Sequence, residues 1–201
     1  MPQAIAKSPL GSIPKEMAAL LGEPVLVRGE SSEEFYSLLL AIANATGANN
    51  IIGWSWCNDV AYHIWEGRRF QRIRSGILVE AQVEVVEELL KSTYDGEEVV
   101  AANLYKIIDA KNEARKWASN PEFGEKIDKQ LHLRGYDRNS VLAKAFLLCS
   151  APLAQIDRSI SDLENRRTAT LREIARHHAA MARRFEDLSK VIDGEFSEAA
   201  E

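Results

Sequence analysis

Three side chains that could bind a metal or move a proton lie close together in the sequence, at Asp59, His63 and Glu66. Their spacing of four and three residues places them on one face of an α-helix. Carboxylate and imidazole groups so spaced occur in metal sites of helical bundles, where Glu173 and His177 could add ligands. The repeated Glu-x-x-His pattern of di-iron bundles is absent. We therefore interpret the three as a polar network that fixes helix register, with His63 or Asp59 bonded to an arginine.

No other pattern in the sequence predicts catalysis. We find no Ser/His/Asp order, no Gly-rich phosphate loop, no Walker pattern and no Cys-x-x-Cys pair. Cys57 and Cys149 lie in apolar helical segments, which favours buried thiols over a disulfide or a nucleophile. We interpret His177 and His178 as one partly buried and one solvated imidazole, with a pH switch as the less favoured alternative. We expect no enzymatic activity, no cofactor and no metal.

Arginines on two predicted helices could contact phosphate groups or a protein partner. These candidates are Arg68, Arg72, Arg166, Arg172, Arg176 and Arg183. The last three fall on one helical stripe, as a nucleic-acid-binding face would. The acidic run from Glu80 to Glu88 is a competing partner, because two parallel long helices would bring it level with residues 168–176. We favour pairing between these charges, within the chain or across a dimer, over nucleic acid.

A long amphipathic helix, from about Asn139 to Ile192, is the element against which the rest must pack. Its side chains recur at alternating intervals of four and three residues, which is typical of a coiled-coil seam. The predicted seam consists of Leu142, Phe146, Cys149, Leu153, Ile156, Ile160, Leu163, Arg167, Thr170, Ile174, His177, Met181, Arg184, Leu188 and Val191. Pro152 removes a backbone donor, so we expect either a kink or a break between Ser150 and Pro152.

A second long helix is predicted to begin after Asn49 and Asn50, with apolar positions near heptad spacing as far as residue 89. Trp54 and Trp65 lie on one stripe of this helix and Trp56 on another, so it must be covered on two sides. We interpret Trp56 and Trp65 as core anchors. Shorter helices are predicted over residues 31–46, 97–119 and 121–133, and an extended strap over residues 23–29.

Composition and charge favour a soluble helical protein. The 201 residues are 46% hydrophobic and 27% charged, and the net charge of −5 gives no general attraction to nucleic acid or acidic membrane. No apolar stretch has the length of a bilayer span or a secretory leader, so we expect a cytoplasmic protein without membrane association. We divide the chain into a flexible lead-in (1–22), a single helical domain (23–192) and an acidic tail (193–201).

The sequence resembles a family of uncharacterised all-helical proteins from alphaproteobacteria. The resemblance covers about residues 23–196 and rests on the runs EPVLVRGESSEEFYSLLLAI, WCNDVAYHIWEGRRFQRIR, ARKWASNPEFGEKIDKQL and RRTATLREIARHHAAMARRFED. Its most specific positions are Asp59-Val60, Trp65-Glu66, Arg69, Arg166-Arg167 and Leu171-Arg172-Glu173-Ile174. His63 departs from the pattern, since the family usually has another residue there. The resemblance implies an all-helical fold and carries no implication about chemistry.

Taken together, these features predict an all-α protein: an elongated helical bundle or coiled coil of two long helices and three shorter packing helices. Because the shorter helices cannot cover the whole terminal seam, we expect the protein to self-associate. The expected function is a non-enzymatic protein–protein interaction or scaffold role, with a second copy and an unknown protein as partners. The alternative is a nucleic-acid-associated accessory protein that binds phosphates through its arginine-rich helices.

Overall fold

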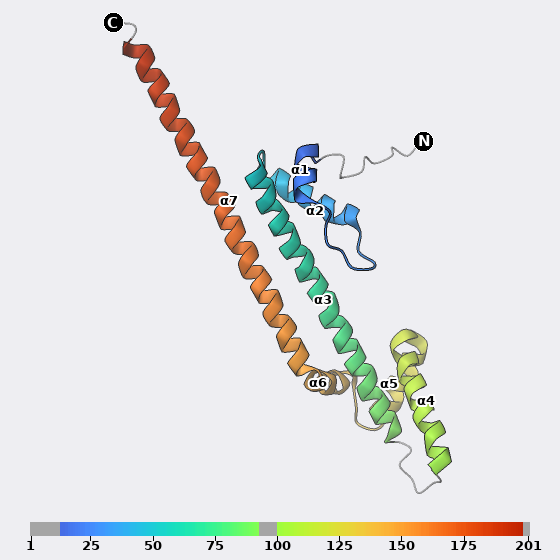
Figure 1. The fold of residues 1–201 in the computed structure, drawn as a ribbon. Coiled ribbons are helices and arrows are strands. Elements are labelled where there is room, and N and C mark those ends of the chain that lie inside the picture. Colours follow the sequence, from blue (N-terminus) through green and yellow to red (C-terminus); the bar gives the residue numbers. More distant parts are fainter. Residues whose placement is uncertain (1–12, 93–99, 199–201) are drawn as a thin grey trace, which may run out of the picture. The chain divides into compact units, whose positions relative to one another are not determined.

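The computed structural model describes residues 13–92 and 100–198, with side chains described over 13–92 and 108–187. Within these ranges the secondary structure is α-helical, without strands, which confirms the predicted all-α class. The helices are α1 (Lys15–Leu21), α2 (Ser32–Thr46), α3 (Ile51–Lys91), α4 (Val100–Ser119), α5 (Pro121–His132), α6 (Arg138–Leu148) and α7 (Ser150–Glu198) (Figure 1).

The chain forms two compact units. Unit 1 contains residues 1–68 and 161–201, and unit 2 contains residues 69–160. The helices α3 and α7 contribute to both units. With 41 and 49 residues these helices extend roughly 60 and 70 Å. The helix α3 contributes buried side chains to two separate clusters, and α7 contributes Leu153 to one of them.

Unit 1 has a core between α2 and the first half of α3. Its buried members are Ile13, Phe35, Leu39, Ala43, Trp54, Cys57, Ala61 and Trp65. The helix α2 begins at Ser31, whose hydroxyl oxygen accepts the Glu34 N–H at 3.3 Å, and ends at Gly47 in the left-handed conformation. Both ends of α2 agree with the sequence prediction, as does the shared burial of Trp54 and Trp65.

The helix α1 was not predicted, since residues 1–22 were expected to form a flexible lead-in. Residues 1–12 lie outside the described part, but Ile13 is buried with 4% of its surface exposed, and Met17 and Leu21 pack on the same core. Pro14 and Gly22 at the two ends of α1 favour a loop locally. Burial of the apolar side of α1 provides the tertiary stabilisation that a short helix needs.

The extended strap predicted over residues 23–29 is confirmed over residues 23–27, which a turn at Arg28 and Gly29 follows, and two side chains of α3 hold it. The Val25 N–H donates to the Tyr62 hydroxyl at 3.0 Å, and Trp65 Nε1–H donates to Glu30 Oε2 at 3.0 Å. The same Glu30 oxygen accepts the Val27 N–H at 3.1 Å. The strap therefore covers the tryptophan side of α3.

Unit 2 packs α4, α5 and α6 around the second half of α3. Its buried members are Ala81, Val85, Val86, Leu89, Leu90, Ala110, Ala114, Ile127, Leu131, Val141, Ala145, Cys149 and Leu153. The Arg134 guanidinium donates to the Leu89 carbonyl at 2.6 Å and to Ser92 Oγ at 2.9 Å. Arg134 thus supplies donors to carbonyl and hydroxyl groups at the C-terminal end of α3, where the helix leaves its own carbonyls without partners.

The predicted terminal helix is interrupted at Cys149, between α6 and α7. Of the two predicted alternatives, a break is therefore correct and a kink within one helix is not. The helices α6 and α7 meet at 77°. Pro152 is the third residue of α7, within the first turn, where its missing N–H removes no helical hydrogen bond. Because of the break, α6 buries Val141 and Ala145 and leaves Leu142 and Phe146 exposed, so these last two residues were wrongly assigned to the seam.

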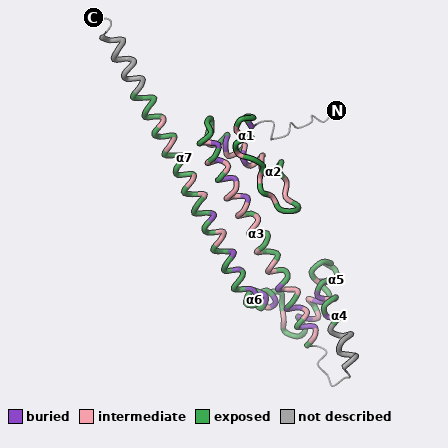
Figure 2. Tube along the Cα trace, in the orientation of Figure 1, coloured by how far each residue is buried: buried purple, intermediate pink, exposed green. Residues whose placement is uncertain are grey.

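The predicted seam is confirmed from Leu153 to Met181. The seam positions from 153 to 181 are buried or half-buried, whereas the neighbouring positions of α7 are mostly exposed (Figure 2). Leu188 and Val191 lie outside the described side chains, and Arg184 is exposed.

The helices α3 and α7 run antiparallel within each unit, which corrects the predicted parallel order. In unit 2, Arg74 pairs with Asp157, and residues further along α3 share a groove with Pro152 and the residues before it. In unit 1, Trp56 near the start of α3 contacts His177 in the second half of α7. None of the described helices is by itself long and apolar enough to span a membrane. The helices α6 and α7, taken together as a bent pair, have the length and composition of a span.

Candidate functional site

The structure does not join Asp59, His63 and Glu66 into the expected polar network. Asp59 is exposed, while His63 and Glu66 are half-buried. Among the described residues, no hydrogen bond or ion pair links the three or ties His63 or Asp59 to an arginine, and His63 Nδ1 is a buried atom without a partner. No group of three metal-ligating side chains forms within the described ranges. The helical spacing placed the three on one face, but nothing in that spacing specifies hydrogen-bond geometry.

The two tryptophans predicted as core anchors differ in their surroundings. Trp65 is buried, with 4% of its surface exposed, and packs edge-on against the Phe35 ring at 5.7 Å between centroids. Trp56 is half-buried and packs edge-on against the His177 ring at 5.3 Å. Trp65 therefore stabilises the core of unit 1, whereas Trp56 lies at the edge of a cavity.

That cavity, of about 260 Å³, lies between the α2–α3 turn and α7 in unit 1. It is lined by Thr46, Gly47, Ala48, Asn49, Asn50, Gly53, Trp56, Ile174, His177, His178, Met181, Ala182 and Phe185. Its three amide and hydroxyl side chains already have partners. The Asn50 side-chain oxygen accepts the Gly53 N–H and its amide nitrogen donates to Asn49 Oδ1, and the Thr46 hydroxyl donates to the Ile42 carbonyl. The lining carries no carboxylate, lysine or arginine, and its titratable side chains are His177 and His178.

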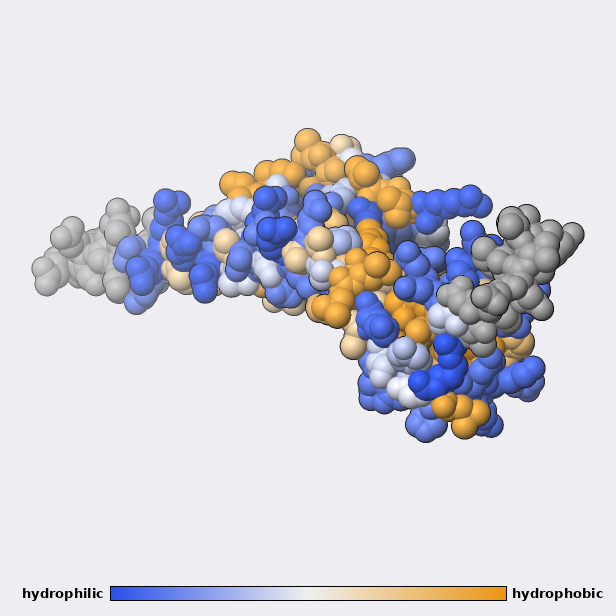
Figure 3. Space-filling model, turned by 90° about the horizontal axis from the view of Figure 1, so that it is seen from below, coloured by the Kyte–Doolittle hydropathy of each residue, from blue (hydrophilic) through white to orange (hydrophobic). Residues whose placement is uncertain are grey.

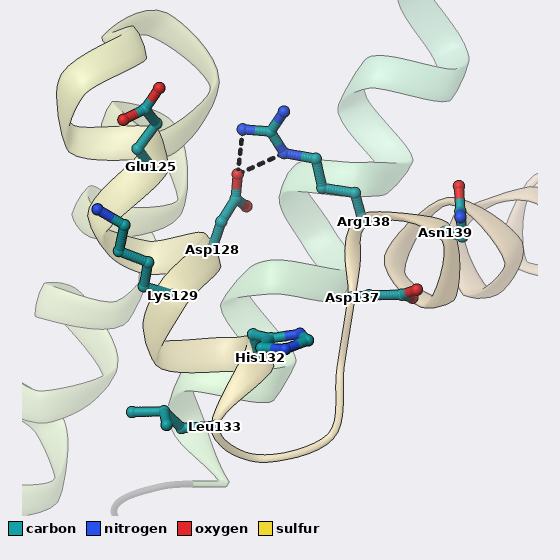
Figure 4. A pocket seen from close by; sticks show the side chains of 8 residues that line it. All are labelled: Glu125, Asp128, Lys129, His132, Leu133, Asp137, Arg138 and Asn139. Atoms are coloured by element: carbon teal, nitrogen blue, oxygen red, sulfur yellow. Dashed lines mark hydrogen bonds and ion pairs between the residues drawn. The ribbon is translucent and has the colours of Figure 1, made fainter.

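A larger open pocket of about 660 Å³ lies between α5 and the start of α6 in unit 2 (Figure 4). It is lined by Glu125, Asp128, Lys129, His132, Leu133, Asp137, Arg138 and Asn139. Arg138 points towards Asp128, and its Nε donates to Asp128 Oδ2 at 2.6 Å. The other oxygen of Asp128 accepts Trp117 Nε1–H at 2.8 Å. Asp128 therefore ties α4, α5 and α6 together.

A second carboxylate of this pocket that accepts hydrogen bonds is Asp137, the N-cap of α6. Its Oδ1 accepts the Ser140 N–H at 2.7 Å and the Ser140 hydroxyl at 2.6 Å. These bonds, the hydroxyl bond first, lower the pKa of Asp137, and the nearby His132 acts in the same direction. Asp128 and Asp137 therefore both have structural roles, in helix packing and in helix capping.

Neither cysteine has the environment of a reactive thiol. Both are buried and free. Burial raises the pKa of Cys57, although the Thr46 hydroxyl, whose Oγ1 lies 3.1 Å from the sulfur, acts in the opposite direction. A thiol with a raised pKa contains little thiolate near neutral pH.

The candidate arginines have different partners. Arg176 pairs with Glu173 on its own helix, and Arg72 is exposed and interacts with another group. Four others are exposed and form no ion pair within the part of the chain that the structure describes: Arg68, Arg166, Arg172 and Arg183. Arg172, Arg176 and Arg183 do share one side of α7, as their spacing predicted.

The prediction that the acidic run from Glu80 to Glu88 lies beside residues 168–176 of α7 is wrong. Glu80 and Glu84 belong to unit 2, whereas Arg172 and Arg176 belong to unit 1. Within unit 2 the acidic run shares a groove with Pro152 at the start of α7, as the antiparallel direction requires. The prediction that these charges meet at one level assumed a parallel pair.

A second stripe on α7 was missed by the sequence analysis. Thr168, Leu171, Ala175, His178, Ala182 and Phe185 follow one another at intervals of three and four residues, and all six are exposed. All six stand one position after a predicted seam residue, so the signal was present in the sequence but was hidden by the stronger seam beside it. Leu171 and Phe185 expose 41% and 67% of their surface. The row of Arg172, Arg176 and Arg183 borders this stripe.

No family model, no curated protein and no solved structure matches the chain. The resemblance to alphaproteobacterial helical proteins therefore stays a prediction.

Proposed function

We propose that this protein is a non-enzymatic, self-associating helical interaction protein. The observation that carries the proposal is the exposed stripe of α7 in unit 1, formed by Thr168, Leu171, Ala175, His178, Ala182 and Phe185. Alternating intervals of three and four residues keep such a stripe on one side of a helix over several turns, which is how coiled-coil helices contact one another. Alanine at two of the six positions allows the backbone of a partner helix to approach closely.

The seam on the neighbouring face of α7 is occupied within the chain. The stripe is exposed, although its second half, His178, Ala182 and Phe185, also lines the cavity of unit 1. Ile174 on the seam is buried, whereas Ala175 next to it is exposed. A single exposed leucine needs no explanation in a soluble protein. A stripe that continues over five turns, with an arginine row along its border, is a surface that a partner helix can cover.

The helix α6 supports the same proposal from unit 2. Leu142, Phe146 and Leu147 expose 40, 48 and 72% of their surface. Hydrophobic side chains also form separate clusters between hydrophilic ones on the face seen in Figure 3. Exposed apolar surface of this kind marks protein–protein contacts more often than catalysis.

Light scattering coupled to size exclusion tests the proposal. We expect a mass above the monomer value of 22.5 kDa at high micromolar concentration. The double variant Leu171→Glu/Ala175→Glu should return the mass to that of the monomer, because charged side chains cannot be buried without a partner. The matched control is Ala169→Glu/Ala180→Glu, two exposed positions on the far side of the arginine row, which should leave the mass unchanged.

The nucleic-acid alternative is decided in the same samples. Binding of labelled duplex DNA or single-stranded RNA that weakens at least tenfold between roughly 50 and 200 mM salt would favour phosphate contacts by the arginines. A wild-type protein that stays monomeric and binds nucleic acid in this way overturns the self-association proposal.

A further inference from the structure

A groove in unit 2 has the chemistry that the arginine-bordered stripe of α7 requires. It has a volume of about 640 Å³ and lies between α3, α4 and the α6–α7 break. Its apolar part is formed by Ile73, Ile77, Val83, Leu148 and Pro152, and its acidic part by Glu80, Glu84 and Glu87. A volume of this size holds a few side chains and not a whole helix, so a partner would insert side chains from its surface.

The acidic part of the groove is open to a basic partner. Glu80 and Glu84 are exposed and form no ion pair with any residue that the structure describes. Lys111 and Arg115 line the same groove without pairing with these glutamates, and Glu87 pairs with Lys91 on its own helix. Glu80 and Glu84 therefore carry the negative charge that is available on the α3 side of this groove, while Lys111 and Arg115 of α4 add two positive charges to its lining.

The spacing of the two charged rows matches. Glu80 and Glu84 lie four residues apart on α3, and Arg172 and Arg176 lie four residues apart on α7. Residues at this spacing are neighbours on one face of a helix, so two helices can pair both charges at once. Beside Arg172, Leu171 supplies an exposed apolar side chain that the Ile73 and Ile77 side of the groove can cover.

We propose that the acidic groove of one copy binds the arginine-bordered stripe of α7 from a second copy, with Arg172 and Arg176 facing Glu80 and Glu84. This inference rests on the proposed self-association and names the surfaces that carry it. Charge complementarity identifies a second copy as the occupant, because the chain itself carries both halves of the match. Arg176 exchanges an exposed pair with Glu173 on its own helix, which is worth about 0–1 kcal/mol, for a pair that the groove partly shields from water.

Charge reversal on each surface tests the pairing. We expect Arg172→Glu/Arg176→Glu and Glu80→Arg/Glu84→Arg each to weaken self-association at least tenfold, since each places like charges opposite one another. An equimolar mixture of the two variants should recover a dimer, which native mass spectrometry identifies by its mixed mass. The control Arg166→Glu/Arg184→Glu changes the charge of α7 by the same amount on another face and should leave association unchanged.

These measurements distinguish a failure of the proposed function from a failure of this inference. A wild-type protein that is monomeric overturns the proposed function and this inference together. A wild-type oligomer whose mass neither charge-reversal variant changes overturns the inference alone. Variants that lower the melting temperature equally at all protein concentrations, without a change of mass, show that the charges pair within one chain, and this also overturns it.

Discussion

The carbonyl oxygen of Trp117 lies 2.9 Å from the position that a Cβ atom on Gly124 would occupy. Real Cβ atoms do not approach a backbone oxygen so closely, so α4 and α5 can pack at this distance only with glycine. We expect Gly124→Ala to lower the free energy of unfolding by about 1–3 kcal/mol, as overpacked cores do, measured by urea denaturation. The control is Gly67→Ala in α3, where a Cβ meets nothing within 4 Å. That substitution should raise stability by up to about 1 kcal/mol.

Asp128 should be worth more to stability than an exposed carboxylate, because it accepts bonds from both Trp117 and Arg138. Asp128→Ala leaves the indole N–H without its partner and removes a charge-assisted bond, so we expect a loss of about 1–3 kcal/mol in chemical denaturation. Glu125→Ala on the same helix should change stability by less than about 0.5 kcal/mol. Equal losses for the two variants would show that the Asp128 contacts contribute nothing.

The capping bonds of Asp137 make the stability of α6 depend on pH. Since its pKa in the folded protein is lower than in the unfolded chain, its contribution is present above the unfolded pKa and is lost as pH falls through the folded pKa. We expect the melting temperature of Asp137→Asn to fall less steeply than that of the wild type below about pH 4, because asparagine caps without titrating. Parallel curves for the two proteins in acid would contradict this.

Trp65 and Trp56 should respond differently to truncation. Trp65→Ala removes a buried ring and its bond to Glu30, so we expect a loss of roughly 3–5 kcal/mol. Trp56 is half-buried at a cavity edge, and its replacement by alanine should cost less. Thermal unfolding followed by circular dichroism measures both. A larger loss for Trp56 than for Trp65 would mean that the cavity side of α3 is the more important for stability.

Helix ends could be predicted from the sequence because they depend on local chemistry. Ser31 and Asn120 accept backbone N–H groups three residues ahead, and each was recognisable from a short polar residue before a helical pattern. The break near Pro152 was recognisable for the same reason, although the choice between a kink and a break was not. That choice depends on the tertiary contacts that bury Val141 and Ala145 in the core of unit 2.

The direction of α3 relative to α7 could not be predicted from the sequence. Heptad spacing is the same whether two helices pack parallel or antiparallel. Because the assumed direction was wrong, Glu80 was placed beside Arg172. The predicted pairing of these charges within the chain depended on that placement and fails for the same reason. The helix α1 and the bond from Arg134 to Leu89 are also invisible in a local pattern, since both depend on contacts between distant residues. For the candidate site, spacing predicted which residues share a face of α7 but not that Asp59, His63 and Glu66 would remain unconnected.

The division of the chain into two units has a consequence for synthesis on the ribosome. Unit 2 is continuous in sequence, whereas unit 1 is assembled from residues 1–68 and 161–201. During translation every residue of unit 2 is synthesised before Ile174 and His177, which unit 1 needs to cover Trp56. At roughly 5–20 residues per second, the first half of α3 waits for several seconds with one side uncovered. Nascent chains of this protein therefore expose Trp56 until the second half of α7 has been made, and it is in this interval that a chaperone would bind them.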